Sequence, residues 1–216
     1  MKLTMQIIKK LILEQMDGQK KVYKPEECSI HVVNEGEIVY ALIVDPDKFA
    51  VGLVAAKKPK KDCNLSVQVK NIGTATEYRG QGFGTFLYYA AEIIGKEYQG
   101  LTGGITSDHE ESSSKDAKGA WASMIGKKKI QLVNPKQGQA KFDYTGKETP
   151  DVKTDDCDMP SSGDPAVDYA FKFTGGLRSK YAKIFKQMVK NMKRNPIPED
   201  DVADMIMDLW GKVYKG

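Results

Sequence analysis

A cluster of glycines directly before an apolar run is the feature that most restricts how this chain can fold. Residues 78–85 read YRGQGFGT, and residues 86–94 read FLYYAAEII. Glycine adopts left-handed conformations that other residues avoid, and the apolar run suits a buried helix. The sequence therefore predicts a flexible bend that leads into a helix from about Phe83 to Tyr98, which Gly100 ends.

The bend and the helix start together suit an anion. The N–H groups in the first turn of a helix lack intrahelical acceptors and lie at the positive end of the helix dipole. Glycines allow the backbone to close around a phosphate, and Arg79 either adds a charge there or points to solvent. A P-loop is excluded because Gly84-Thr85 has no lysine, and Gly80, Gly82 and Gly84 do not have the spacing of a dinucleotide fingerprint. A purely structural bend is the alternative.

The residues before the bend predict a run of antiparallel strands. CSIHVV, EIVYALIV and FAVGLVAA are rich in β-branched residues, and DPDK predicts a tight turn between the last two. NLSVQVKNIGTA predicts a further strand, in which Gly73 indicates a bulge or the close approach of another backbone. Residues 4–16 predict a helix, with a short first strand as the alternative.

The residues after the helix alternate between strand and helix patterns. LTGGITS, KKIQLVN and DYAFKFT predict strands, and SSSKDAKGAWASMIG predicts a helix. Residues 134–166 show little periodicity and predict a long loop. Two amphipathic helices end the chain, one with its apolar face from Leu177 to Met192 and one, after Pro198, with its apolar face from Val202 to Val213.

The net charge of +4 is mild but unevenly distributed. Acids outnumber bases from Asp143 to Asp168, whereas the stretch from Arg178 to Arg194 holds seven Lys or Arg residues and no acid. These two segments either pair with each other or form solvated faces. The alternative is that the basic helix is a platform for nucleic acid or an acidic partner, although no DNA-binding motif accompanies the lysines.

Length and composition set the class of protein. The 216 residues, 40% hydrophobic and 29% charged, suit one sizeable globular domain or one domain with an appendage. The apolar runs are far shorter than the roughly 20 residues of a membrane span, and lysines within the apolar part of the N-terminal segment argue against a signal peptide. Cys28, Cys63 and Cys157 fit neither a disulfide framework nor a zinc site. We therefore expect a cytoplasmic protein with no bound metal and no membrane partner.

The bend and its neighbours resemble the GNAT acetyltransferases. RGQGFG matches the family signature R/Q-x-x-G-x-G/A, with Arg79, Gly82 and Gly84 at the signature positions. TATEYRGQGFGTFLYYAAEII is similar to the family's strand, loop and long helix, GLTGGIT lies where its next strand belongs, and SKDAKGAWASMIG resembles the following helix. The resemblance covers about residues 30–135 and does not explain residues 136–216.

The resemblance implies a site for acetyl-CoA. In the family, N–H groups of this loop wrap the CoA diphosphate, and the end of the preceding strand runs beside the pantetheine. An N–H near Thr74 would polarise the thioester carbonyl, and a neutral amine would attack the thioester directly. The residues implied at the cofactor are Ile72, Thr74, Thr76, Arg79, Gly80, Gln81, Gly82, Phe83, Gly84, Thr85 and Ser114.

The helix after the next strand departs from the family pattern. Many members have a tyrosine that protonates the leaving thiolate where this chain has Trp121, and an asparagine where it has Ser114. Indole is not a general acid near neutral pH. Either another residue protonates CoA, or the thiolate leaves unassisted, or the domain binds without turnover.

Candidates for the catalytic base follow the strand after the long helix. His109 has a suitable intrinsic pKa, and Asp108 or Glu110 would assist it. The alternative is a polar loop of helix-capping acids. Glu77 is a second candidate base or a solvated loop acid, and His31, on an early strand, is expected to be structural.

We therefore expect an α/β (α+β) fold, with a GNAT-like mixed, mostly antiparallel central sheet flanked by helices and a C-terminal two-helix extension. The GNAT-like domain would span residues 1–175, including the loop at 134–166, and the extension residues 176–216. The expected function is transfer of acetyl from acetyl-CoA to an amine of an unidentified small molecule or protein. The alternatives are a GNAT-fold binding or assembly module without turnover, and a protein directed to nucleic acid by helix 177–194.

Overall fold

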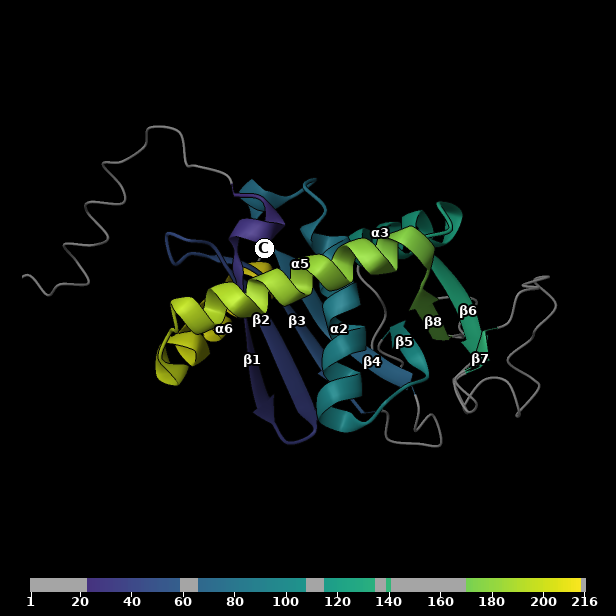
Figure 1. Cartoon of the computed structure of the whole chain (residues 1–216), viewed down its shortest axis with the longest axis horizontal. Coiled ribbons are helices and arrows are strands. Elements are labelled where there is room, and N and C mark those ends of the chain that lie inside the picture. Colours follow the sequence, from purple (N-terminus) through teal and green to yellow (C-terminus); the bar gives the residue numbers. More distant parts are fainter. Residues whose placement is uncertain (1–22, 59–65, 108–114, 135–138, 141–169, 215–216) are drawn as a thin grey trace, which may run out of the picture.

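The structure is a computed structural model that describes residues 23–58, 66–107, 115–134, 139–140 and 170–214. Within these residues, eight strands form one sheet in the order β1-β2-β3-β4-β5-β8-β6-β7, with helices on both faces (Figure 1). The expected mixed, mostly antiparallel sheet flanked by helices is confirmed, and it is consistent with a GNAT-like fold. The strands are β1 (Ser29–Glu35), β2 (Ile38–Val44), β3 (Ala50–Lys57), β4 (Ser66–Thr74), β5 (Gly104–Ser107), β6 (Ile130–Asn134), β7 (Gln139–Ala140) and β8 (Ala170–Phe173). The helices are η1 (Pro25–Glu27), η2 (Thr76–Tyr78), α2 (Phe83–Gln99), α3 (Lys115–Gly126), α5 (Gly175–Arg194) and α6 (Glu199–Tyr214).

Strands β4 and β5 form the parallel pair of the sheet, and the other described pairs are antiparallel. β4 pairs with β5 only from Ser66 to Val69. Among the described residues, the rest of β4, from Asn71 to Thr74, pairs with β3 alone. The strand that leads into the glycine bend therefore has one edge without a described strand neighbour.

Gly73 marks a close approach of two backbones. A Cβ atom built on Gly52 of β3 would come within 2.9 Å of the Gly73 carbonyl oxygen. The register shift between β3 and β4 lies between Ala55 and Ala56, whose partners are Asn71 and Val69, so the extra residue is Lys70. Of the two features that the sequence indicated for Gly73, the structure shows the close approach at Gly73 and the bulge three residues earlier.

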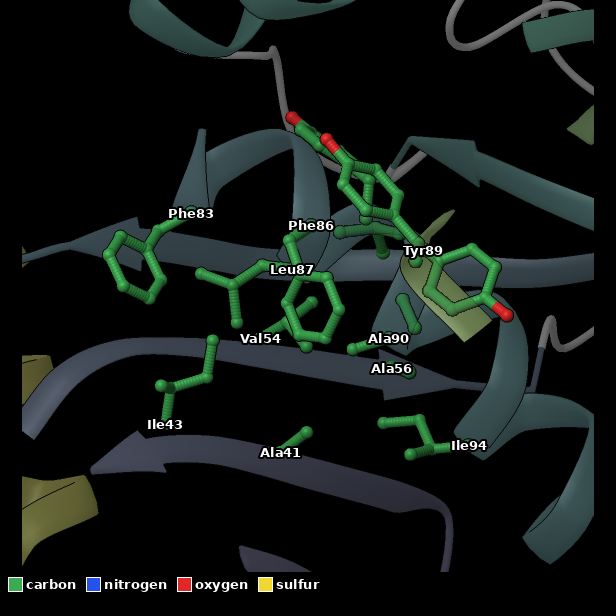
Figure 2. Packing of buried hydrophobic residues seen from close by; sticks show 14 of the residues in the cluster. Ala41, Ile43, Val54, Ala56, Phe83, Phe86, Leu87, Tyr89, Ala90 and Ile94 are labelled. Carbon is green, nitrogen blue, oxygen red and sulfur yellow. The ribbon is translucent and has the colours of Figure 1, made fainter. Parts of the chain in front are cut away.

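Helices α2 and α5 cover one face of the sheet. Figure 2 shows Phe86 and Leu87 of α2 beside Val54 of β3, in the main hydrophobic cluster. α5 crosses α2 on the same side (Figure 1) and adds Tyr181 and Met188 to this cluster. The glycine bend is thus followed by a helix that is buried between the sheet and another helix.

A second hydrophobic cluster lies beneath α6. Val202, Ile206 and Leu209 of α6 pack with Leu42 and Leu53 of the strands. Residues of the main cluster alternate with these along β2, which places the two clusters on opposite faces of the sheet. The two C-terminal helices therefore cover different faces. The division into a domain of residues 1–175 and an extension of residues 176–216, packed on or beside it, stays a prediction.

A glycine near the C-terminal end of α2 allows the helix to pack closely on the sheet. A Cβ atom on Gly95 would lie 2.0 Å from Cγ2 of Val67 on β4, a distance at which atoms overlap. Gly100 caps the C-terminal end of the helix in a left-handed conformation with φ +69°, as expected. The N–H of Leu101 donates a hydrogen bond to the Gly95 carbonyl at 3.1 Å.

Some sequence predictions fall outside the described residues. The helix at 4–16 and most of the loop at 134–166 are among them. Within the loop, the short strand β7 was not predicted. None of the described helices combines the length and the apolar character that crossing a membrane requires.

Candidate functional site at the glycine bend

The bend depends on two glycines in left-handed conformations. Gly80 has φ +78° and Gly82 has φ +90°. A Cβ atom at either position would have no neighbour within 4 Å, so the backbone conformation rather than space requires glycine there. Gly82 caps α2, and its carbonyl accepts the first helical hydrogen bond from Phe86 N at 3.0 Å. The bend predicted at the start of this helix is confirmed; its flexibility stays a prediction.

The N–H groups of the bend have no hydrogen-bond acceptor within the described part of the chain. No described residue accepts a hydrogen bond from the backbone N–H groups of Gln81 to Thr85, and Gly82 offers no side-chain cap. These groups lie at the positive end of α2, which has 17 residues. The local chemistry favours an acceptor with negative charge.

Two side chains of the bend donate hydrogen bonds to main-chain carbonyls close to it in sequence. Arg79 is exposed, and its Nε donates a hydrogen bond to the Thr74 carbonyl at 3.4 Å, so it connects the bend to the end of β4. Gln81 Nε2 donates to the Glu77 carbonyl at 3.1 Å. Both hydrogen bonds use main-chain acceptors, which leaves the N–H groups of the bend to other partners.

A buried tyrosine holds the bend against the sheet. The hydroxyl of Tyr78 donates a short hydrogen bond to Oδ2 of Asp45, and both residues are buried. Oδ1 of Asp45 accepts from Phe49 N at 2.8 Å, within the predicted DPDK turn. Burial, and next the hydrogen bond to Asp45, raise the pKa of Tyr78 well above its usual range. The Tyr78 ring also meets Phe83 edge-on, with 5.7 Å between centroids.

This contact between Tyr78 and Asp45 was missed by the sequence analysis. The two residues are 33 positions apart. The sequence signals at each position are local, because the glycines indicate a bend and DPDK indicates a turn. No local pattern indicates that the turn and the bend are joined.

The first turn of α2 lies against the end of β4. A Cβ atom on Gly84 would lie 3.9 Å from Oγ1 of Thr74, an ordinary contact distance. Thr74, Thr76 and Arg79 line a pocket of about 290 Å³ together with residues of α6 that include Asp208. The structure thus brings together the strand end and the bend, two parts that the resemblance assigned to one cofactor site.

Four of the predicted site residues lie outside the described part of the chain. They are Asp108, His109, Glu110 and Ser114. β5 ends at the buried Ser107, directly before them. Their roles stay predictions.

Trp121, which the resemblance aligned with an acid of the GNAT acetyltransferases, belongs to the hydrophobic core. It is buried on α3, with its ring 4.8 Å from that of Tyr88 and 5.8 Å from that of Phe171, measured between centroids. The indole therefore has a packing role here. The described residues contain no cluster of three His, Cys, Asp or Glu side chains that could hold a metal ion.

His31 and Cys28 have structural environments. Nε2 of His31 lies 3.0 Å from Oγ of Ser29, and burial lowers the pKa of the imidazole, which agrees with the structural role expected for it. The pKa of the Cys28 thiol rises to about 12, mainly through burial and then through the nearby Asp45 carboxylate. A thiol with this pKa is a poor nucleophile near neutral pH.

The sequence matches no protein-family model, and no curated protein matches it. Among solved structures, the chain is similar to the crystal structure of nourseothricin acetyltransferase, with a TM-score of 0.35 and 15% identity, over 49% of this chain and 70% of that chain. A similarity of this size establishes neither a shared family nor a shared activity.

Proposed function

We propose that the chain binds acetyl-CoA at the glycine bend and transfers the acetyl group to an amine. The observation that carries the proposal is the row of N–H groups from Gln81 to Thr85 at the positive end of α2. No described residue accepts a hydrogen bond from these groups. A diphosphate supplies the acceptors and the negative charge that such a row favours. The signature positions of Arg79, Gly82 and Gly84 support CoA as the source of that diphosphate.

The end of β4 fits the next part of the ligand. From Asn71 to Thr74 this strand pairs with β3 alone among the described residues, so its other edge can bond a chain of amides. In the proposal, Ile72 to Thr76 flank the pantetheine, and an N–H near Thr74 polarises the thioester carbonyl. Acetyl-CoA supplies the activated acyl group.

The proton transfers are assigned to residues after β5. His109, with Asp108 or Glu110, would deprotonate the attacking amine, and Ser114 would contact the cofactor. Trp121 is buried among aromatic rings and does not act as the acid. A free thiol has a pKa of about 8.5, so the CoA thiolate leaves without a dedicated acid at a moderate cost in rate.

The second candidate function is binding without turnover. The burial of Trp121 in the core favours it, because the position of the family's acid has become a packing position. Such a module would retain the bend and its N–H groups. It would bind CoA and acetyl-CoA alike and release no thiol.

Thermal unfolding with CoA or acetyl-CoA tests the proposal. A ligand at about 100 times its Kd adds about 2.7 kcal/mol, which corresponds to about 5–10 °C in Tm for a chain of this size. Absence of a shift with both ligands would refute the acetyl-CoA site. Release of free CoA thiol across a panel of amines would then confirm transfer, whereas a Tm shift without thiol release would support the binding module.

A further inference from the structure

The exposed face of α5 carries a continuous row of positive charges. Five of the six charged residues follow one another at intervals of three or four positions, and the sixth, Arg194, adjoins Lys193. This spacing places them on one side of the helix. The opposite side, with Tyr181, Ile184 and Met188, is buried in the main cluster. The row spans about 21 Å at 1.5 Å per residue. We call it the basic stripe; it consists of Lys180, Lys183, Lys186, Lys190, Lys193 and Arg194, all exposed.

The charges of the basic stripe are not neutralised within the described part of the chain. Arg178, the seventh cation of the segment, forms an ion pair with Glu92 and is not part of the stripe. None of the six stripe residues forms an ion pair with a described residue. Glu26 lines a groove of about 550 Å³ with Lys180 and Lys183, yet no ion pair joins it to either.

Apart from its charges, the stripe has no side chains that could recognise a base. The two amide side chains on α5 are engaged: Gln187 Nε2 donates to Asn191 Oδ1 at 2.9 Å, and Asn191 Nδ2 donates to the Cys28 carbonyl at 2.8 Å. Among the described residues, the exposed large hydrophobic side chains are Tyr98 on α2 and Met207 on α6. The stripe therefore has no aromatic platform for bases and no free amide for reading them.

The same features argue against other anionic partners. A stable protein–protein interface needs a desolvated centre with apolar or aromatic anchors, and a membrane-surface helix inserts apolar side chains between lipids. The apolar face of α5 is already packed in the core. A phosphodiester backbone is different, because cations alone supply sequence-independent affinity for it.

We propose that the basic stripe binds the phosphate backbone of a nucleic-acid duplex without reading its sequence. The stripe is about 21 Å long, and a duplex carries one negative charge per about 1.7 Å of its axis. Up to six phosphates can thus be contacted from one helix face. The inference is independent of the acetyl-CoA site.

The test is fluorescence anisotropy of a labelled DNA duplex of mixed sequence, titrated with the full chain at several salt concentrations. Each phosphate contact contributes about −0.9 to the slope of log K against log salt. The variant Lys183→Gln, Lys186→Gln, Lys190→Gln removes three central charges and keeps good helix formers. We expect binding at least about tenfold weaker at low salt, and a slope smaller in magnitude by about 2 to 3.

A matched variant separates the stripe from the net charge. Lys96→Gln, Lys118→Gln, Lys127→Gln removes three exposed lysines from α2, α3 and the turn after α3. It should bind the duplex within about twofold of the unchanged chain. Equal loss in both variants, an unchanged slope, or no binding at low salt would overturn the proposal. Displacement of the duplex by polyglutamate as readily as by unlabelled DNA of equal charge would assign the stripe to an acidic protein instead.

Discussion

Glu92 of α2 and Arg178 of α5 form an ion pair that joins the helix behind the glycine bend to the C-terminal part of the chain. Oε2 of the buried Glu92 also accepts a hydrogen bond from Phe173 N at 3.1 Å. Arg178 Nη1 donates to the Phe173 carbonyl at 3.4 Å. One buried carboxylate therefore connects α2, β8 and α5.

Removing the cation of this pair should destabilise the fold. Arg178→Ala leaves the Glu92 carboxylate buried, with Phe173 N as its one remaining donor among the described residues. We expect a loss of about 1–3 kcal/mol in the free energy of unfolding, measured with urea, because Arg178 is partly exposed and the pair is only partly desolvated. Lys180→Ala, at the next basic position, which is exposed, should change stability by less than about 0.5 kcal/mol. Equal effects of the two changes would show that the ion pair contributes nothing.

A negative charge in the first turn of α2 should separate folding from ligand binding. Gly84→Asp places a carboxylate near the positive end of the helix, which favours the free protein by about 0.3–1 kcal/mol. The same carboxylate repels a diphosphate. The Tm of the free protein should therefore hold or rise, while the Tm shift with acetyl-CoA disappears.

Gly84→Asn is the neutral control for this change. It has nearly the same shape, and a Cβ atom at this position has an ordinary contact with Thr74. Part of the ligand-induced shift should remain. If Asn and Asp abolish the shift equally, crowding rather than charge controls the site.

The hydrogen bond between Tyr78 and Asp45 should hold the bend in its binding conformation. Tyr78→Phe keeps the ring against Phe83 and removes the donor, so the buried Asp45 loses one partner. We expect a loss of about 1–3 kcal/mol in stability and a weaker Tm shift with acetyl-CoA. Tyr98→Phe changes an exposed hydroxyl and should alter neither quantity. An unchanged ligand shift in Tyr78→Phe would mean that the bend keeps its shape without this bond.

His31 should make the protein less stable in mild acid. Burial lowers the pKa of its imidazole from 6.5, so the unfolded chain binds a proton at a higher pH than the folded chain does. The stability that the neutral imidazole contributes is therefore fully present above the pKa that His31 has in the unfolded chain. As the pH drops below that pKa, the free energy of unfolding falls by at most about 1.4 kcal/mol per pH unit for one proton.

The comparison is between the unchanged chain and His31→Gln. Urea unfolding from about pH 7.5 to about pH 5 should give a smaller loss of stability in the variant, because it lacks the titrating ring. Parallel curves for the two proteins would rule His31 out as the cause.

The elements that were predicted well have strong local signals. The DPDK turn, the left-handed glycines and the helix from Phe83 follow from residue types over a few positions. The place of β8 between β5 and β6 could not be predicted in this way. β8 begins at Ala170, far along the chain from both neighbours, and local pattern carries no information on such pairing.

The candidate site likewise has features that local sequence predicts and features that depend on contacts between distant residues. The bend could be predicted because glycine spacing is a local property. Glu92 lies within an apolar run and has its partner at Arg178, 86 positions later, so no local pattern distinguishes Arg178 from the other cations of α5. Side-chain contacts across such separations depend on the completed fold.

The missing side chain at Gly95 has a consequence for the bend at the other end of α2. Because Gly95 has no side chain, α2 packs closely against Val67 of β4 at this position. Any larger residue at position 95 would overlap the Val67 side chain, so that the helix would have to move away from β4. Such a movement would displace the end of α2 that presents the N–H groups. The position of the N–H groups at the proposed diphosphate site therefore depends on a residue about three helical turns away from them.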